Sequence, residues 1–192
     1  MFEYNMIGEF MDYEILVNKD NTLNKTYVPS ELVDANSEYK DGILVNSKVL
    51  EQFKLMKYDA NKLGYKIDIM SGYRDYMYQD KIYNKLLKEK GFAYTFRSVA
   101  KPGCSEHQTG LAVDLCVYRD DKCYIEHELE DSEEISWVIN NCYKYGFILR
   151  YPRGMEDRTG YNYEPWHFRY VGDIALYLHE NNLLLEDYVD SK

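Results

Sequence analysis

"PGCSEHQTGLAVDL", residues 102–115, contains the strand around which we expect the fold to form. In its second half Leu111, Val113 and Leu115 alternate with residues 112, 114 and 116, which is the period of a strand with one face in the core. Asp114 then lies inside the strand, on the face opposite the apolar residues. A carboxylate there is unfavourable unless a cation or a hydrogen-bond donor meets it. The rest of the sequence has to supply that partner.

Helix and strand patterns surround this stretch without regular β-α alternation. The predicted helices are 46–63, with an apolar stripe and Gly64 as its stop, 75–90, with Asp75 as N-cap and Gly91 as its stop, about 132–145, and the tail from 173. The predicted strands are 66–70, 111–117, 147–151 and 166–171. A capping box from Asp131 to Glu134 is expected to open the third helix. We therefore predict an α+β fold, a single domain over 1–192 with a small, mostly antiparallel central sheet flanked by helices.

The bulk composition excludes several classes of function. A net charge of −10 without a basic stripe argues against a nucleic-acid partner. No apolar run is long enough to cross a membrane, and residues 1–20 do not resemble a signal peptide, so we expect a cytoplasmic protein. The 4 cysteines form no CxxC pair, which predicts reduced, mostly buried thiols.

The stretch "YEPWHFRYVG", residues 163–172, supplies a candidate partner for Asp114. A lone histidine in an aromatic strand is more often a core residue than a ligand. With His107 and Asp114, however, His167 completes two imidazoles and one carboxylate, a set that leaves a tetrahedral Zn²⁺ one open position for water. Glu164 could act as the base on that water. Residues three apart in an ideal strand face opposite sides, so this role requires an irregular strand entrance at Pro165.

Five stretches of the chain show a combined pattern: "LVNKDNTLNKTYVPSELV" (16–33), "SGYRDYMYQ" (71–79), "PGCSEHQTGLAVDL" (102–115), "GFILRYP" (146–152) and "TGYNYEPWHFRYVG" (159–172). Together they resemble the VanY/VanXY family of zinc D,D-peptidases, and they occur in the order found in that family. The resemblance covers most of the chain and is closer to the soluble VanXY-type enzymes than to membrane-anchored VanY.

The resemblance implies roles for seven residues. His107, Asp114 and His167 would bind zinc, and Glu164 would be the general base and acid. Arg74 would stabilise the substrate carbonyl or the oxyanion, Ser105 would help to hold the substrate, and Gln79 matches a family glutamine that contacts it. Two alternatives stay open: Arg74 as a plain ion-pair partner of Asp114, and Gln79 as a polar residue on the exposed side of a helix. We expect His127 and His179 to be surface residues.

The resemblance further implies zinc-dependent hydrolysis of D-Ala-D-Ala-type bonds in peptidoglycan precursors, as a D,D-carboxypeptidase, a D,D-dipeptidase or both. The partner would then be a small peptide ending in D-Ala. One alternative is an L,D-carboxypeptidase that uses the same zinc site. Another is a non-catalytic peptide-binding protein on this fold. Glu164 favours an enzyme over a binding protein, because a binding protein has no need of a base beside the metal.

Overall fold

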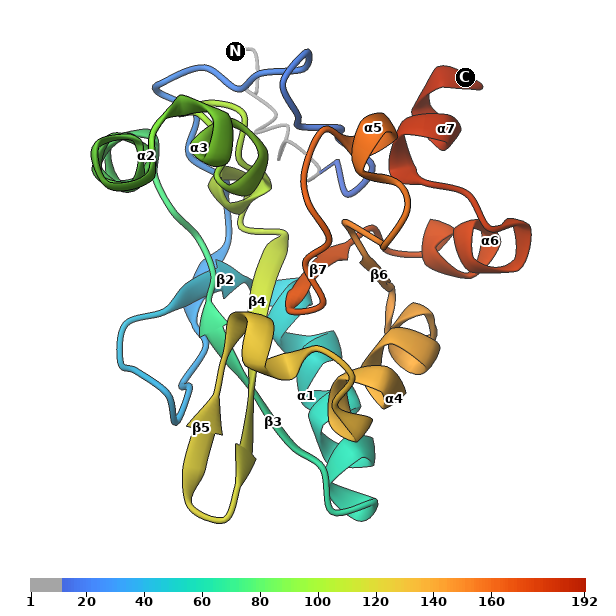
Figure 1. Ribbon diagram of the computed structural model, residues 1–192. Helices are drawn as coiled ribbons and strands as arrows, with labels where there is room; N and C mark the ends of the chain where they lie inside the picture. The colour runs from blue at the N-terminus through green and yellow to red at the C-terminus, as the bar shows by residue number, and fades with distance from the viewer. Residues whose placement is uncertain (1–11) are drawn as a thin grey trace, which may run out of the picture.

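The strand that contains Asp114 is the central strand of the main sheet in the computed structural model, which describes residues 12–192 (Figure 1). The five strands of this sheet are β3 (Lys66–Ser71), β4 (Ala112–Arg119), β5 (Lys122–Tyr124), β6 (Phe147–Leu149) and β7 (His167–Tyr170). β4 pairs with β3 along one edge, and with β7 and β5 near the two ends of its other edge. β6 adds to β7, and every pair is antiparallel. The predicted sheet is confirmed.

Helices surround this sheet, and a two-stranded sheet of β1 (Leu32–Asp34) and β2 (Leu44–Asn46) precedes the first of them. The α-helices are α1 (Ser47–Lys62), α2 (Tyr76–Lys90), α3 (Phe92–Ser98), α4 (Glu133–Asn141), α5 (Glu156–Thr159), α6 (Ile174–Asn181) and α7 (Leu185–Asp190). Short 3-10 turns are η1 (Glu106–Thr109), η2 (Glu126–Leu129) and η3 (Cys142–Tyr145). The α+β class is therefore confirmed, whereas α3, α5, β1, β2 and β5 are elements that the sequence patterns did not predict.

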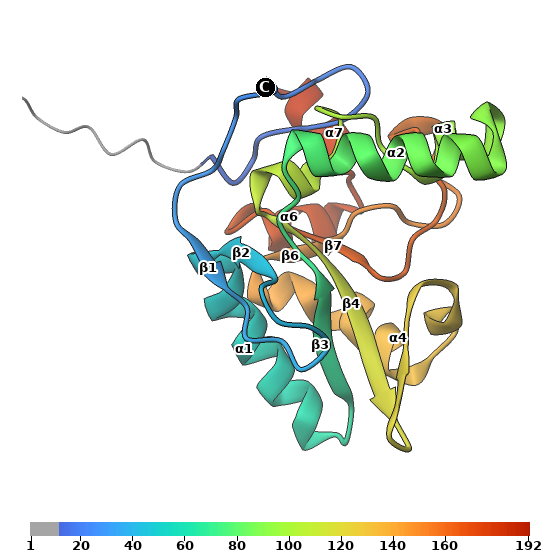
Figure 2. The same cartoon turned by 90° about the vertical axis from the view of Figure 1, so that its left-hand side faces the viewer.

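The main core lies between the sheet and two of the helices. The alternating residues Leu111, Val113 and Leu115 of the β4 stretch are buried and pack with buried apolar side chains of α1 and α4. In Figure 2, α1 lies on one side of β3 and β4, while α2 crosses above the ends of these strands. Asp114 projects from the opposite face of β4, as the alternation predicts, so the functional candidates lie away from the apolar core.

Local signals fix the ends of the long helices, with two corrections. The Asn46 and Asp75 side chains accept hydrogen bonds from the first turns of α1 and α2, and Gly91 ends α2 with φ of 78°. The predicted capping box of α4 is wrong, because the hydroxyl of Ser132 accepts from the backbone N–H of Ile135 instead. Leu63 does not join the buried stripe of α1 and is 57% exposed.

The structure bears to different extents on three expectations about the chain as a whole: its membrane spans, its N-terminal stretch and its cysteines. Within residues 12–192 no helix is long and apolar enough to cross a membrane. Much of the N-terminal stretch from which the lack of a signal peptide was inferred, residues 1–11, lies outside the described residues. The 4 cysteines are free thiols, and three of them are buried.

Candidate active site

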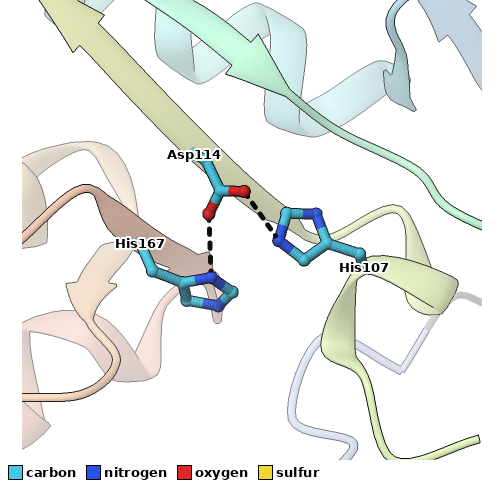
Figure 3. A group of neighbouring side chains, drawn as sticks. All are labelled: His107, Asp114 and His167. Atoms are coloured by element: carbon cyan, nitrogen blue, oxygen red, sulfur yellow. Dashed lines mark hydrogen bonds and ion pairs between the residues drawn. The ribbon is translucent and has the colours of Figure 1, made fainter. Parts of the chain in front are cut away.

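The three predicted metal ligands converge from three separate segments. Asp114 on β4 and His167 on β7 are register partners across the antiparallel pair, which places their side chains side by side. His107 lies in η1, just before β4, where Gly110 with φ of 72° turns the chain into the strand. Each of the three residues offers a ligand atom within 4.8 Å of the others, and all three are buried (Figure 3).

Hydrogen bonds orient both imidazoles so that one nitrogen of each faces the Asp114 carboxylate. The Nδ1 of His107 lies 2.6 Å from the carbonyl oxygen of Gly72, which leaves its Nε2 facing Asp114 Oδ2 at 3.2 Å. The Nδ1 of His167 lies 3.0 Å from Asp114 Oδ1. Two nitrogen donors and a carboxylate are a ligand set that suits zinc, and the buried Nε2 of His107 makes no hydrogen bond within the described chain. The residues present therefore fit a zinc ion.

The two histidines differ in charge. Burial, together with the nearby Arg74, lowers the pKa of His107 to about 4, so its imidazole is neutral. Burial would also lower the pKa of His167, but the carboxylates of Asp114, Glu106 and Glu164 around it together outweigh burial and raise that pKa to about 9. Burial would raise the pKa of Asp114, yet the two imidazoles hold it well below its usual range. Without a metal, Asp114 and His167 thus form a buried ion pair.

Glu164 approaches this cluster from a turn before β7. The backbone N–H of His167 donates to the carbonyl of Glu164 at 3.1 Å, so residues 164–167 form a tight turn and not regular strand. The Glu164 carboxylate lies 3.8 Å from His167 Nδ1. Burial raises its pKa to about 7, which suits a group that must gain and lose a proton near neutral pH.

Arg74 follows β3 and lies beside the same cluster. Its backbone N–H donates to the carbonyl of His107 at 3.1 Å, and its Nη2 is 3.7 Å from Asp114 Oδ2. The buried Nε makes no hydrogen bond within residues 12–192. The geometry thus contains the ion pair with Asp114 and also leaves donor capacity for a bound molecule.

Ser105 and Gln79 both line the cleft beside the cluster. Ser105 is buried and immediately precedes η1. Gln79 is only 1% exposed, and its side-chain amide donates to the carbonyl of Ala100 at 2.8 Å. Its Oε1 makes no hydrogen bond within the described part of the chain. The alternative interpretation of Gln79 as an exposed helix residue is therefore wrong.

A cleft of about 690 Å³ contains the whole cluster, a size typical of small-molecule and peptide sites. Its walls include side chains from α2, α3 and η2 and several aromatic rings, among them Tyr151, Tyr161 and Trp166. His127 is exposed, as predicted, but it stands at the rim of the cleft, with its ring edge-to-face with Trp166 at 4.9 Å. His179 is exposed on α6, away from the cleft lining.

A buried carboxylate next to His107 was missed by the sequence analysis. Glu106 is 1% exposed and accepts hydrogen bonds from Arg150 and Arg169, at 2.8 and 2.9 Å. Its second oxygen lies 3.6 Å from the Nε2 of His167. The signal that could have revealed it is the pair of arginines inside the strand-like runs "FILRY" and "WHFRYV", because a buried guanidinium also requires a partner.

A buried His-Asp-His cluster, a neighbouring carboxylate with a pKa near neutrality and an enclosing cleft define a centre of the mononuclear metallopeptidase type. Residues 42–173 match the family model described as "VanY: D-alanyl-D-alanine carboxypeptidase". The chain belongs to the VanY family.

Two relatives and two solved structures show how close these similarities are. The chain is 40% identical to YodJ of Bacillus subtilis (strain 168), over 91% of this chain and 66% of YodJ. It is also 40% identical to VanXYC of Enterococcus gallinarum, a bifunctional D-Ala-D-Ala dipeptidase and carboxypeptidase, over 82% of both chains. The LdcB LD-carboxypeptidase superposes with a TM-score of 0.83 at 39% identity, over 91% of this chain and 84% of LdcB. A VanY D,D-pentapeptidase in complex with Zn(II) superposes with a TM-score of 0.78 at 32% identity, over 92% and 98%.

Proposed function

We propose that this chain is a zinc-dependent D,D-peptidase, which hydrolyses D-Ala-D-Ala-type bonds at the ends of peptidoglycan precursor peptides. The observation that carries the proposal is the buried cluster of His107, Asp114 and His167 with Glu164 beside it. The similarity to the dipeptidase and carboxypeptidase VanXYC, at 40% identity, supports the substrate class. The Zn(II) complex of the VanY D,D-pentapeptidase, at 32% identity, supports the choice of metal.

Three side chains would hold the metal, through Nε2 of His107, the carboxylate of Asp114 and Nδ1 of His167, because the other imidazole nitrogens face Gly72 and Glu106. A bound zinc ion supplies Lewis acidity, which makes the deprotonation of water favourable near neutral pH.

The remaining chemistry belongs to residues of the chain. With a pKa of about 7, Glu164 can accept the proton of the attacking water and return it to the leaving amine. Arg74 offers a fixed positive charge to the oxygen that becomes negative in the transition state, or to the terminal carboxylate of the peptide. Gln79, with an unpaired buried oxygen, and Ser105 would hold the peptide in the cleft.

A second candidate function is L,D-carboxypeptidase activity, in which the bond broken follows an L-residue. The similarity to the LdcB LD-carboxypeptidase, with a TM-score of 0.83 at 39% identity, favours this candidate. The same cluster and the same base would serve either reaction, since side chains that line the cleft, and not the metal ligands, would select the chirality of the peptide.

Release of D-Ala from a panel of substrates tests the proposal: D-Ala-D-Ala, a pentapeptide ending in D-Ala-D-Ala, and a tetrapeptide ending in an L-residue followed by D-Ala. We expect turnover of one or both of the first two. In Glu164→Gln, kcat should fall about 100-fold or more while zinc content and KM change little, because the lost group acts in the transition state. Glu180→Gln, an exposed carboxylate on α6, is the matched control and should retain full activity.

Each other outcome has a definite meaning. Turnover of the tetrapeptide alone would establish the L,D-carboxypeptidase. A zinc-loaded protein that binds the peptides and cleaves none of them would establish the binding protein. Near-normal turnover by Glu164→Gln would exclude Glu164 as the base.

A further inference from the structure

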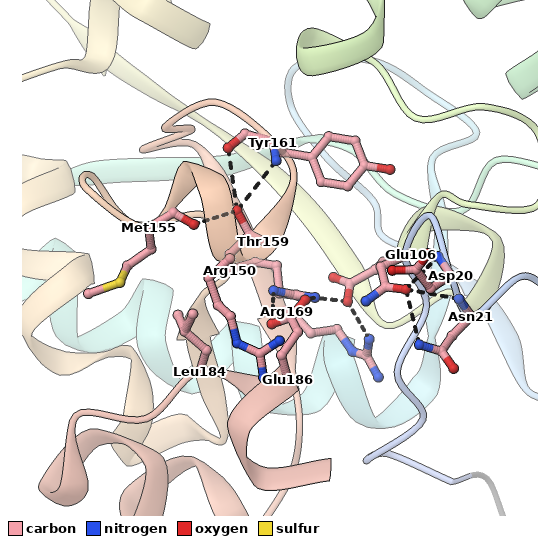
Figure 4. Close-up of polar contacts among 12 residues, drawn as sticks. Asp20, Asn21, Glu106, Arg150, Met155, Thr159, Tyr161, Arg169, Leu184 and Glu186 are labelled. Atoms are coloured by element: carbon pink, nitrogen blue, oxygen red, sulfur yellow. Dashed lines mark hydrogen bonds and ion pairs between the residues drawn. The ribbon is translucent and has the colours of Figure 1, made fainter. Parts of the chain in front are cut away.

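Glu106 lies beside His167 at the wall of the cleft and belongs to a buried polar network with two arginines (Figure 4). It opens η1 and directly precedes His107, and its side chain is fully buried. One oxygen, Oε1, accepts hydrogen bonds from Arg150 Nε at 2.8 Å and from Arg169 Nη1 at 2.9 Å. The other oxygen, Oε2, lies 3.6 Å from the Nε2 of His167 and makes no hydrogen bond within residues 12–192.

The position of Oε2 matters because the Nε2 of His167 is also buried and otherwise unpaired in the described chain. A ring proton on Nε2 that points toward Glu106 would satisfy both atoms at once. In the neutral imidazole that a metal ligand must be, the lone pair of His167 is then on Nδ1, the nitrogen that faces Asp114. His107 shows the complementary arrangement, since the Gly72 carbonyl engages its Nδ1 and leaves its Nε2 on the ligand side.

The acceptors of the two imidazoles differ in charge. A backbone carbonyl is neutral, whereas Glu106 brings a carboxylate, and a carboxylate that accepts the distal ring proton makes the opposite nitrogen a better donor to a metal. The two guanidinium groups on Oε1 keep Glu106 ionised and hold its carboxylate at one place. Both arginines belong to the strand region that carries His167: Arg169 is two residues after it on β7, and Arg150 follows the neighbouring strand β6.

We propose that Glu106 is a positioning residue for the metal site, which fixes His167 in the Nε2–H tautomer and strengthens its Nδ1 as a ligand. This inference rests on the proposed function only in requiring that His167 bind zinc. Glu106 does not reach the reacting atoms and takes no part in proton transfer to the substrate.

The same buried network offers a matched control. The remaining nitrogens of Arg150 form a two-point ion pair with Glu186 of α7, at 2.9 and 2.5 Å. Glu186 is buried like Glu106 and shares the same arginine, but no contact joins it to His167. Loss of either carboxylate leaves a guanidinium short of a partner, whereas only loss of Glu106 takes an acceptor from the imidazole.

The test is the zinc dissociation constant of the wild type, Glu106→Gln and Glu186→Gln, measured by competition with a chromophoric chelator, with the melting temperature of each metal-free protein recorded alongside. Both variants should melt below the wild type. We expect zinc affinity to fall about 10- to 100-fold in Glu106→Gln, the usual cost of losing such an outer partner, and to change less than about threefold in Glu186→Gln. Equal affinities in all three proteins, or equal losses in both variants, would overturn the proposal.

If the Glu106→Gln protein does not fold, two further measurements still test the proposal. Glu106→Asp keeps the charge for the arginines but draws the carboxylate back from His167, so it should fold and bind zinc more weakly than the wild type. Long-range ¹H–¹⁵N spectra of the zinc-loaded wild type should show His167 protonated on Nε2. Protonation on Nδ1 would refute the inference. A wild type that binds no zinc would instead refute the proposed function.

Discussion

Glu164 should make the metal-free protein less stable at high pH, and Glu164→Gln should remove that penalty. Burial raises the pKa of this carboxyl from 4.5 to about 7 in the folded protein. A folded-state pKa above the unfolded value means that folding favours the protonated form. The stability from this group is therefore complete below about pH 4.5 and is lost as the pH rises through about 7. At about 1.4 kcal/mol per pKa unit, the loss at pH 8 amounts to about 3.5 kcal/mol at most.

Urea unfolding of the metal-free wild type and Glu164→Gln at pH 5 and pH 8 measures this effect. A glutamine has the same size and stays neutral, and within residues 12–192 the Glu164 side chain makes no hydrogen bond that the change would remove. The unfolding free energy of the variant, relative to that of the wild type, should rise by about 2–3 kcal/mol between the two pH values. Taking the difference in unfolding free energy between the two proteins cancels the contribution of every other titrating group.

Two outcomes would refute the reasoning. One is a difference between the proteins that is the same at both pH values, and the other is a variant less stable than the wild type at pH 8. Glu180→Gln should show no comparable change, since its carboxylate is exposed on α6. Saturating zinc should shrink the effect, because a cation beside Glu164 favours the ionised carboxylate.

Two other changes test the metal site. Purified protein should carry about one zinc per chain, removable by a chelator with loss of activity, and His167→Ala should hold the metal much more weakly; full occupancy in this variant would contradict the ligand assignment. Gly72→Ala would place a Cβ 2.3 Å from the carbonyl oxygen of Leu44, so the backbone must shift and move the carbonyl that orients His107. We expect a loss of about 1–3 kcal/mol in urea unfolding together with weaker zinc binding in chelator competition; an unchanged affinity would show that the Gly72 carbonyl has no such role.

Sequence patterns predicted those elements of the fold whose signals are local. The helix α1 follows from its apolar stripe and the stop after it, and α2 follows from the Asp75 cap and Gly91, which act within one turn of the chain. The alternation around Asp114 gave β4 and the face on which the carboxylate lies. The α4 cap failed because Ser132 and Asp131 are both good capping residues, and the choice between them depends on how the chain leaves η2.

In the candidate site, too, features that depend on local sequence could be predicted, and contacts between residues far apart in the chain could not. The ligand residues could be proposed from residue types and motifs, and their convergence depends on the register that sets Asp114 opposite His167. The partners of Glu106 could not be found in this way, because Arg150 and Arg169 are 44 and 63 residues away in the chain. Their position in strand-like apolar runs was visible in the sequence, however, and the question raised by a buried aspartate applies equally to a buried arginine.

The carboxylates of Glu106 and Glu164 approach opposite nitrogens of His167, and their different surroundings give them very different pKa values. Burial would raise the pKa of both. For Glu106 the guanidinium groups of Arg150 and Arg169 outweigh burial and hold its pKa well below the usual range, so it remains an anion at every pH at which the protein would act. No cation within residues 12–192 is hydrogen-bonded to Glu164, and burial raises its pKa to about 7. A group that must take up a proton and release it in each cycle needs a pKa near neutrality, as Glu164 has. A fixed hydrogen-bond acceptor must instead stay ionised, as Glu106 does. This contrast supports Glu164 as the base of the proposed reaction and Glu106 as the residue that positions the imidazole between them.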